Sequence, residues 1–272
     1  MPYVDADGVR LHYETSGEGP QVAVFVHGWP GCWLWWEETV RRLPRNVFSY
    51  SLDMRGAGQS ERPAGGYRIE QYAADVVAFA DALGLERFVY VGHSTGGAIG
   101  YQLALGQPER LDALVLVDPA AADGEQADAA ATRRFLERAR DPVGLRHFVE
   151  SRVFAGPVAP ELLDMVVEWA LKASDGYFVD TVYALQRLRL GDRLGEIDVP
   201  TLILAGADGG VVAREAIVKA AGTIPDCTLD LLEGAGHAPM LEAPDAFVRV
   251  LVGFLDSLRR VDEATDLPPA GT

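Results

Sequence analysis

One stretch of seven residues, Val91-Gly92-His93-Ser94-Thr95-Gly96-Gly97, constrains the fold of this chain more than any other. It follows an apolar run at 87–91 that is typical of a buried strand, and it precedes residues 98–105, which are typical of a helix. A Gly-x-Ser-x-Gly sequence between a strand and a helix is typical of a nucleophile elbow. The two glycines allow a turn too tight for side chains, which lifts Ser94 above the end of the sheet beside the first N–H groups of the helix. We therefore predict that Ser94 is a nucleophile.

The rest of the chain alternates apolar strands with helices. This alternation predicts an α/β fold, in which a mostly parallel, doubly wound sheet is flanked by helices. The predicted strands are 9–14, 21–27, 47–53, 87–91, 112–118, 200–206 and 228–232, and the predicted flanking helices are about 37–43, 71–83, 98–105 and 245–259.

A long segment without a clear strand interrupts this alternation. Its helical patterns cover 128–140, 144–154, 160–173 and 177–190. We therefore predict a core formed by 1–119 and 197–261 and a helical cap formed by 120–196. Ligands of open α/β sheets bind at the carboxyl ends of the strands, so a cap there would roof the site. The acidic, Pro- and Gly-containing segment 262–272 is predicted to be a flexible tail.

The net charge of −16 argues against partners that are themselves anionic. Nucleic acid and anionic membrane surfaces would repel such a chain, whereas a hydrophobic small-molecule substrate would not. The N-terminus has no signal-peptide pattern, and no apolar run approaches the roughly 20 residues that span a bilayer. Two distant cysteines, Cys32 and Cys227, favour a reduced protein without disulfides. We expect a cytoplasmic monomer or homodimer with no metal and no cofactor.

Four motifs follow one another along the chain. They are His27-Gly28-Trp29-Pro30, Asp53-x-Arg55-Gly56-x-Gly58-x-Ser60, Gly92-His93-Ser94-Thr95-Gly96-Gly97 and Gly234-Ala235-Gly236-His237. With them the chain resembles the α/β-hydrolase superfamily over about residues 8–260. The resemblance implies a triad of serine, acid and histidine beneath a helical cap. It implies no particular substrate, because this fold hosts many chemistries.

A serine hydroxyl is a weak nucleophile until a base takes its proton, and His237 is the candidate base. It lies in a loop after the last predicted strand, and the order of serine first and histidine last matches this fold. Five other polar residues in the motifs are expected to be structural: His27, His93, Asp53, Arg55 and Ser60.

The acid that orients the histidine has two candidates. In the superfamily it usually lies three residues beyond the glycine that ends the strand 202–206, and that position is Gly209, which has no carboxylate. Asp208 lies one residue earlier. The alternative is Asp118, at the end of the strand after the elbow, where certain lactonases and haloalkane dehalogenases place their acid. We favour Asp118 and keep Asp208 as the alternative, since either could reach the histidine.

Two backbone N–H groups are candidates for an oxyanion hole. Thr95 follows the nucleophile, and Trp29 lies in the loop after the first long buried strand. Four aromatic residues are expected to line an apolar substrate pocket: Trp33, Trp36, Tyr177 and Phe178. Such a pocket suits a hydrophobic ester or lactone.

These residues favour a serine hydrolase that cleaves an ester or lactone through an acyl-enzyme. One alternative is a cofactor-free dioxygenase of the same fold, in which a His237–Asp118 pair deprotonates the substrate and Ser94 is auxiliary. The motifs at His27 and Gly92 also resemble cofactor-free haloperoxidases. The loop His27-Gly28-x-Pro30-x-x-Trp33-x-x-Trp36 resembles epoxide hydrolases, although those enzymes use a carboxylate nucleophile. A catalytically inactive, ligand-binding member is the remaining alternative.

Overall fold

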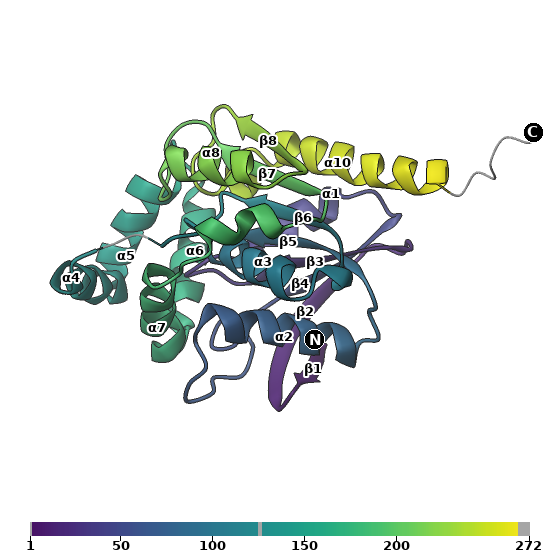
Figure 1. Cartoon of the computed structure of the whole chain (residues 1–272). Helices are drawn as coiled ribbons and strands as arrows, with labels where there is room; N and C mark the ends of the chain where they lie inside the picture. Colours follow the sequence, from purple (N-terminus) through teal and green to yellow (C-terminus); the bar gives the residue numbers. More distant parts are fainter. Residues whose placement is uncertain (1, 125–126, 266–272) are drawn as a thin grey trace, which may run out of the picture.

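An eight-stranded sheet forms the centre of the molecule in the computed structural model, which describes residues 2–124 and 127–265 (Figure 1). Its strands are β1 (Tyr3–Ala6), β2 (Val9–Ser16), β3 (Gln21–Val26), β4 (Val47–Leu52), β5 (Phe88–His93), β6 (Leu111–Val117), β7 (Thr201–Gly206) and β8 (Cys227–Leu232). They lie in the order β1-β2-β4-β3-β5-β6-β7-β8. Strand β2 pairs antiparallel with both β1 and β4, and the pairs from β4 through β3, β5, β6 and β7 to β8 are all parallel. The predicted fold class is confirmed.

Helices cover both faces of this sheet because the strands are apolar on both sides. In β3, the side chains of Val24 and Val26 pack on one face, and those of Ala23 and Phe25 pack on the other. The first face is covered by α2 (Ile69–Ala82), α3 (Thr95–Gly106) and α8 (Arg214–Thr223). The second is covered by α1 (Glu37–Arg42), the 3₁₀ turn η1 (Trp33–Trp36), α9 (Pro239–Glu242) and α10 (Pro244–Thr265).

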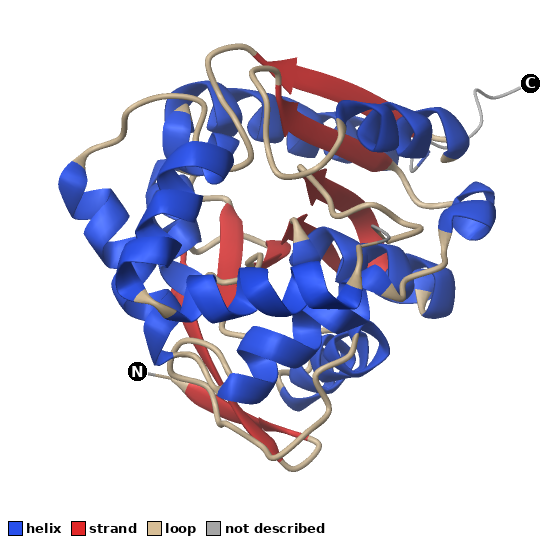
Figure 2. Ribbon diagram, turned by 90° about the vertical axis from the view of Figure 1, so that its left-hand side faces the viewer, coloured by secondary structure: helices blue, strands red, loops and turns tan. Residues whose placement is uncertain are grey.

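The chain between β6 and β7 forms the helical lobe at the left of Figure 1, which faces the viewer in Figure 2. Its elements are α4 (Ala129–Arg140), α5 (Pro142–Phe148), the π-helical turn η3 (Val149–Val153), α6 (Pro160–Lys172), α7 (Asp175–Gln186) and the 3₁₀ turn η4 (Gly191–Glu196). They contain no strand among the described residues. We call this segment, residues 120–196, the helical insertion.

The last helix is longer than its periodicity indicates. Helix α10 continues to Thr265, so residues 262–265 of the segment predicted to be a tail are helical. No glycine or proline occurs between Phe254 and Leu267 to end the helix earlier. Residues 266–272 lie outside the described part of the chain. Among the residues described, none of the helices has both the length and the apolarity needed to cross a bilayer.

Candidate active site

Ser94 occupies a strained turn between β5 and α3. Its φ of +50° is in the left-handed region, which a non-glycine residue rarely adopts. A Cβ on Gly92 would lie 2.3 Å from the carbonyl oxygen of Gly96, and a Cβ on Gly96 would lie 2.4 Å from that of Val26. Because these contacts are with backbone, no side-chain movement would relieve them. The turn therefore requires both glycines, as the sequence pattern indicated.

His237 lies in the loop after β8, and its Nδ1 is 2.6 Å from Oδ1 of Asp118. Both residues are buried. Asp118 follows β6 directly, its N–H donates to the carbonyl of Leu204, and its Oδ2 accepts the N–H of Gly206 at 3.2 Å. The carboxylate is thus held from β7 while it orients the imidazole. With Nδ1 engaged, Nε2 is the nitrogen of His237 that remains available to a neighbour.

Asp208, the alternative acid, has a different partner. It is exposed, and its carboxylate accepts the N–H of Gly234. Its own N–H donates to the carbonyl of Ala235. Asp208 therefore braces the loop that leads to His237 and makes no hydrogen bond with the imidazole, which is bonded to Asp118 instead.

Ser94 and His237 both line a cavity of about 370 Å³ between the strand ends and the helical insertion. Three aromatic side chains gather in its wall: the Trp29 ring centroid is 5.7 Å from that of Phe135 and 6.3 Å from that of Phe148. Its described lining residues are Trp29, Ser94, Thr95, Ala120, Ala121, Gly124, Ala127, Phe135, Phe148, Arg152, Val153, Val182, Leu185, Gln186, Val211, Val212 and His237. The cavity is mostly apolar and has two polar side chains from the insertion, Arg152 and Gln186.

The two expected oxyanion-hole residues meet beside Ser94. Thr95 is the first residue of α3, where N–H groups have no acceptor within the helix. The Trp29 N–H donates to Oγ1 of Thr95 at 3.3 Å, a long hydrogen bond. Both residues line the cavity.

None of the four aromatic residues expected in the pocket lines this cavity, which corrects that expectation. Trp36 is fully buried against Phe25 and Phe247, and the backbone N–H of Trp33 donates to Oδ1 of Asp53. Periodicity does not say which way a loop or a short turn presents its side chains, and η1 directs these tryptophans away from the cavity.

Tyr177 and Phe178 lie behind the loop that carries Trp29. The Tyr177 hydroxyl donates to the carbonyl of Gly28 at 3.2 Å, and the Trp29 Nε1–H donates to that of Phe178 at 3.0 Å. The Phe178 ring centroid is 4.9 Å from that of Trp29. Both side chains are fully buried, and so they support the loop from the insertion instead of facing a substrate.

Comparisons with known proteins identify the family of this chain. Residues 23–250 match the family described as "Alpha/beta hydrolase family". The chain belongs to the α/β-hydrolase family. It is 33% identical over 262 residues to a putative carbamate hydrolase, RutD, from Variovorax paradoxus, and the match covers 90% of this chain and 96% of that protein. It is 29% identical to 3-oxoadipate enol-lactonase 2 from Acinetobacter baylyi, and that match covers 89% of this chain and 91% of the lactonase.

A solved esterase from Exiguobacterium antarcticum is similar in structure. Its TM-score is 0.86 at 27% identity, with 93% of this chain and 98% of that chain covered. These relatives are hydrolases by name, and the match supports hydrolysis as the general chemistry of this α/β-hydrolase.

His93, beside Ser94 in this α/β-hydrolase, joins the turn between β5 and α3 to the loop that carries His237. Its Nε2–H donates to the backbone carbonyl of His237 at 2.8 Å. Burial, and then the nearby His237, hold the pKa of His93 well below its usual value, so the ring is neutral near pH 7. A Cβ on Gly28 would lie 2.6 Å from Nδ1 of this ring. Like His27, whose Nε2 accepts the Met54 N–H, His93 connects loops.

Glu242, which belongs to none of the sequence motifs, holds the loop of His237 from the other side. Its Oε1 accepts the N–H groups of Gly236 at 2.9 Å and Ala238 at 3.2 Å. Its Oε2 accepts the N–H of Ala155, in the insertion, at 2.6 Å. Burial raises the pKa of Glu242, and the three N–H donors oppose that rise. No sequence motif marks such a residue, because its partners are backbone N–H groups, and one of them, that of Ala155, is remote in sequence.

Replacing Glu242 by glutamine is expected to release the insertion from this loop. The amide keeps one oxygen, while its NH₂ group would face an N–H donor. We expect the free energy of unfolding to fall by about 1.5–3 kcal/mol, the usual contribution of a hydrogen bond to a charged group. Urea denaturation measures it, and the exposed Glu215→Gln on α8 is the control. Equal stability of the two variants would contradict this role.

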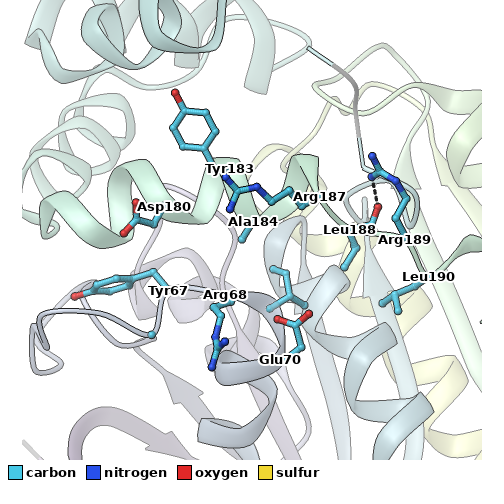
Figure 3. A pocket seen from close by; sticks show the side chains of 12 residues that line it. Tyr67, Arg68, Glu70, Asp180, Tyr183, Ala184, Arg187, Leu188, Arg189 and Leu190 are labelled. Atoms are coloured by element: carbon cyan, nitrogen blue, oxygen red, sulfur yellow. Dashed lines mark hydrogen bonds between the residues drawn. The ribbon is translucent and has the colours of Figure 1, made fainter. Parts of the chain in front are cut away.

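A larger hollow of about 640 Å³ lies on the opposite face of α7 (Figure 3). It is lined by Asp180, Tyr183, Ala184 and Arg187, which lie on one face of the helical wheel, whereas Val182, Leu185 and Gln186 line the cavity of Ser94. This hollow contains none of the triad residues and is not the candidate active site. Among residues 2–124 and 127–265, no cluster of three His, Cys, Asp or Glu side chains could hold a metal ion.

Proposed function

We propose that this protein hydrolyses an ester or lactone of a small apolar molecule, with Ser94 as nucleophile, His237 as general base and Asp118 as the orienting acid. One observation carries the proposal: the buried hydrogen bond between Asp118 and His237, at a cavity that both His237 and the strained Ser94 line. A nucleophile, a base and a group that orients the base are what acyl transfer needs.

In the first half-reaction, Nε2 of His237 takes the proton of Ser94 while Oγ attacks the carbonyl carbon. Negative charge moves to the carbonyl oxygen, where the N–H groups of Thr95 and Trp29 donate to it. The hydrogen bond from the Trp29 N–H to Oγ1 of Thr95 is long and therefore weak, so this N–H can give it up and donate to the oxyanion instead. The imidazolium then gives its proton to the leaving oxygen, the C–O bond breaks and the alcohol departs. Asp118 stabilises the imidazolium throughout.

In the second half-reaction, water takes the place of the alcohol. His237 removes one proton from the water, hydroxide attacks the acyl carbon and the same oxyanion forms. His237 returns the proton to Oγ of Ser94, and the carboxylic acid is released. With a lactone, the alcohol and the acid are parts of one product, a hydroxy acid.

The apolar part of the cavity wall supports a substrate with an apolar, partly aromatic portion. Trp29, Phe135 and Phe148 offer ring faces and edges close to the site of attack. The names of the relatives, an enol-lactonase, an esterase and a carbamate hydrolase, all describe attack on a carbonyl carbon, which favours ester or lactone cleavage here.

This function is tested with phenyl acetate and an aliphatic lactone as substrates. Proton release measures hydrolysis, and an oxygen electrode in the same closed cell measures oxygen uptake. We expect release of acid without oxygen uptake. A dioxygenase in which His237 and Asp118 deprotonate the substrate would instead consume oxygen with its substrate and leave esters intact. Binding of these compounds without turnover would favour a ligand-binding member of the family.

A further inference from the structure

One charged side chain lines the cavity of Ser94. Arg152 is exposed, and within the described part of the chain its guanidinium forms no ion pair or hydrogen bond. Many other arginines of this protein have carboxylate partners, as Arg55 has in Asp75 and Arg146 in Asp164. No aspartate or glutamate is among the described residues that line the cavity. A guanidinium with five N–H donors is therefore presented to whatever fills this space.

The backbone of Arg152 is fixed relative to the histidine loop. Arg152 is in the π-helical turn η3, and the carbonyl of the next residue, Val153, accepts the N–H of His237 at 2.8 Å. Two residues further on, the Ala155 N–H donates to Glu242. A Cβ on Gly236 would lie 2.8 Å from the nitrogen of Ala155, so this approach requires glycine. The insertion therefore holds Arg152 at a set place beside His237.

This position defines which part of a substrate Arg152 meets. His237 hands its proton to the leaving oxygen, so the leaving group lies on the side of the cavity next to the histidine loop. Gln186 adds a second polar group from the insertion: its Nε2 donates to the buried Thr132 at 2.8 Å, which leaves its oxygen and one N–H for a ligand. Neither side chain serves the triad.

We propose that Arg152 binds a carboxylate carried by the leaving-group part of the substrate, so that the preferred ester or lactone is anionic and releases a hydroxy acid. The assignment of the leaving-group side rests on the proposed hydrolysis at Ser94. Arginine recognises carboxylate through a bidentate pair of hydrogen bonds, which a neutral substrate cannot form. In a chain with a net charge of −16, a local cation is also needed to attract an anion to this cleft.

The test compares 3-acetoxybenzoate with 3-acetoxybenzamide, which share an acetyl group and a phenolic leaving group and differ in charge. In the wild type we expect kcat/KM to be about tenfold higher for the benzoate, as a charge-assisted hydrogen bond would give. In Arg152→Gln this preference should be lost, with the rate on the benzamide within about twofold of wild type. Arg134→Gln on α4, an exposed arginine away from the cavity, should keep the preference.

Binding of the alcohol products, 3-hydroxybenzoate and 3-hydroxybenzamide, gives a second measurement that needs no turnover. Calorimetry should give a Kd for the benzoate that is about tenfold weaker in Arg152→Gln than in wild type, with little change for the benzamide. If no ester is cleaved but this selectivity is present, the proposed function fails and the carboxylate site stands. Equal binding of the two products, or an equal effect of Arg152→Gln on both, would overturn the carboxylate site.

Discussion

Ser94→Ala is expected to lower kcat for ester or lactone cleavage by about 10⁴-fold or more, the size of effect that loss of the nucleophile has in other serine hydrolases. Without Oγ no acyl-enzyme forms, and only the oxyanion hole and substrate binding remain to assist direct attack by water. Burst and steady-state kinetics with a chromogenic ester measure this loss, and the initial burst should vanish along with turnover.

The variant should fold normally, which keeps the result interpretable. Alanine removes one hydroxyl that makes no hydrogen bond within the described residues and leaves the backbone of the elbow unchanged. Ser257→Ala on α10, where the hydroxyl donates to the carbonyl of Phe254, is a serine control remote from the cavity. A Ser94→Ala protein with a wild-type thermal transition and more than a few per cent of the wild-type kcat would remove Ser94 from the nucleophile's role.

Asp118→Asn is expected to lower kcat by about 10³–10⁴-fold, the effect seen when the acid of a triad becomes its amide. The amide cannot stabilise an imidazolium, and its NH₂ group would face Nδ1 of His237, which favours the tautomer with the proton on Nε2. That tautomer cannot accept the proton of Ser94. The substitution nearly preserves shape, so KM should change far less than kcat.

Asp208→Asn is the matched comparison, because Asp208 was the alternative acid. Its carboxylate bonds a backbone N–H that an amide oxygen can also accept, so kcat should stay within about threefold of wild type. Pre-steady-state acylation rates of the two variants, measured side by side, decide between the acids. A larger loss in Asp208→Asn than in Asp118→Asn would reverse the assignment.

Periodicity and turn residues were sufficient to predict the sheet and most helices within a few residues. One strand and two α-helices were not predicted: β1, α8 and α9. Strand β1 has four residues and is stabilised by pairing with β2, which no local pattern reports. Helix α8 is the crossover that two parallel strands, β7 and β8, require, so topology would have indicated it where propensity did not.

The sequence favoured Asp118 but could not exclude Asp208, because both residues follow strands at the same edge of the sheet. What separates them is local: Asp118 follows β6 with a φ of +42° and a buried carboxylate, whereas Asp208 is exposed and bonded to Gly234. A difference of this kind arises from tertiary packing. By contrast, the tight turn at Ser94 could be predicted from the sequence, because Gly92 and Gly96 on either side of it indicate the backbone conformation directly.

The aromatic lining was mispredicted for a related reason. The sequence places Trp33 and Trp36 close to the motif at His27, but η1 turns the Trp36 ring into the core on the second face of the sheet, and the Trp33 ring lies beside His12. Two of the rings that do line the cavity, those of Phe135 and Phe148, come from α4 and α5. Their place depends on how the insertion packs over the strand ends, which no helical periodicity within the insertion specifies.

The central claim is that Ser94 is the activated nucleophile, and labelling with a fluorophosphonate tests it most directly. Incubation of wild type and Ser94→Ala, followed by intact-mass and peptide mass spectrometry, locates any adduct. We predict one phosphonyl group per wild-type chain, on the peptide that contains Ser94, with loss of hydrolysis in proportion to labelling and no adduct in Ser94→Ala. Hydrolysis by a protein that stays unlabelled, or labelling at another residue that abolishes activity, would contradict the claim.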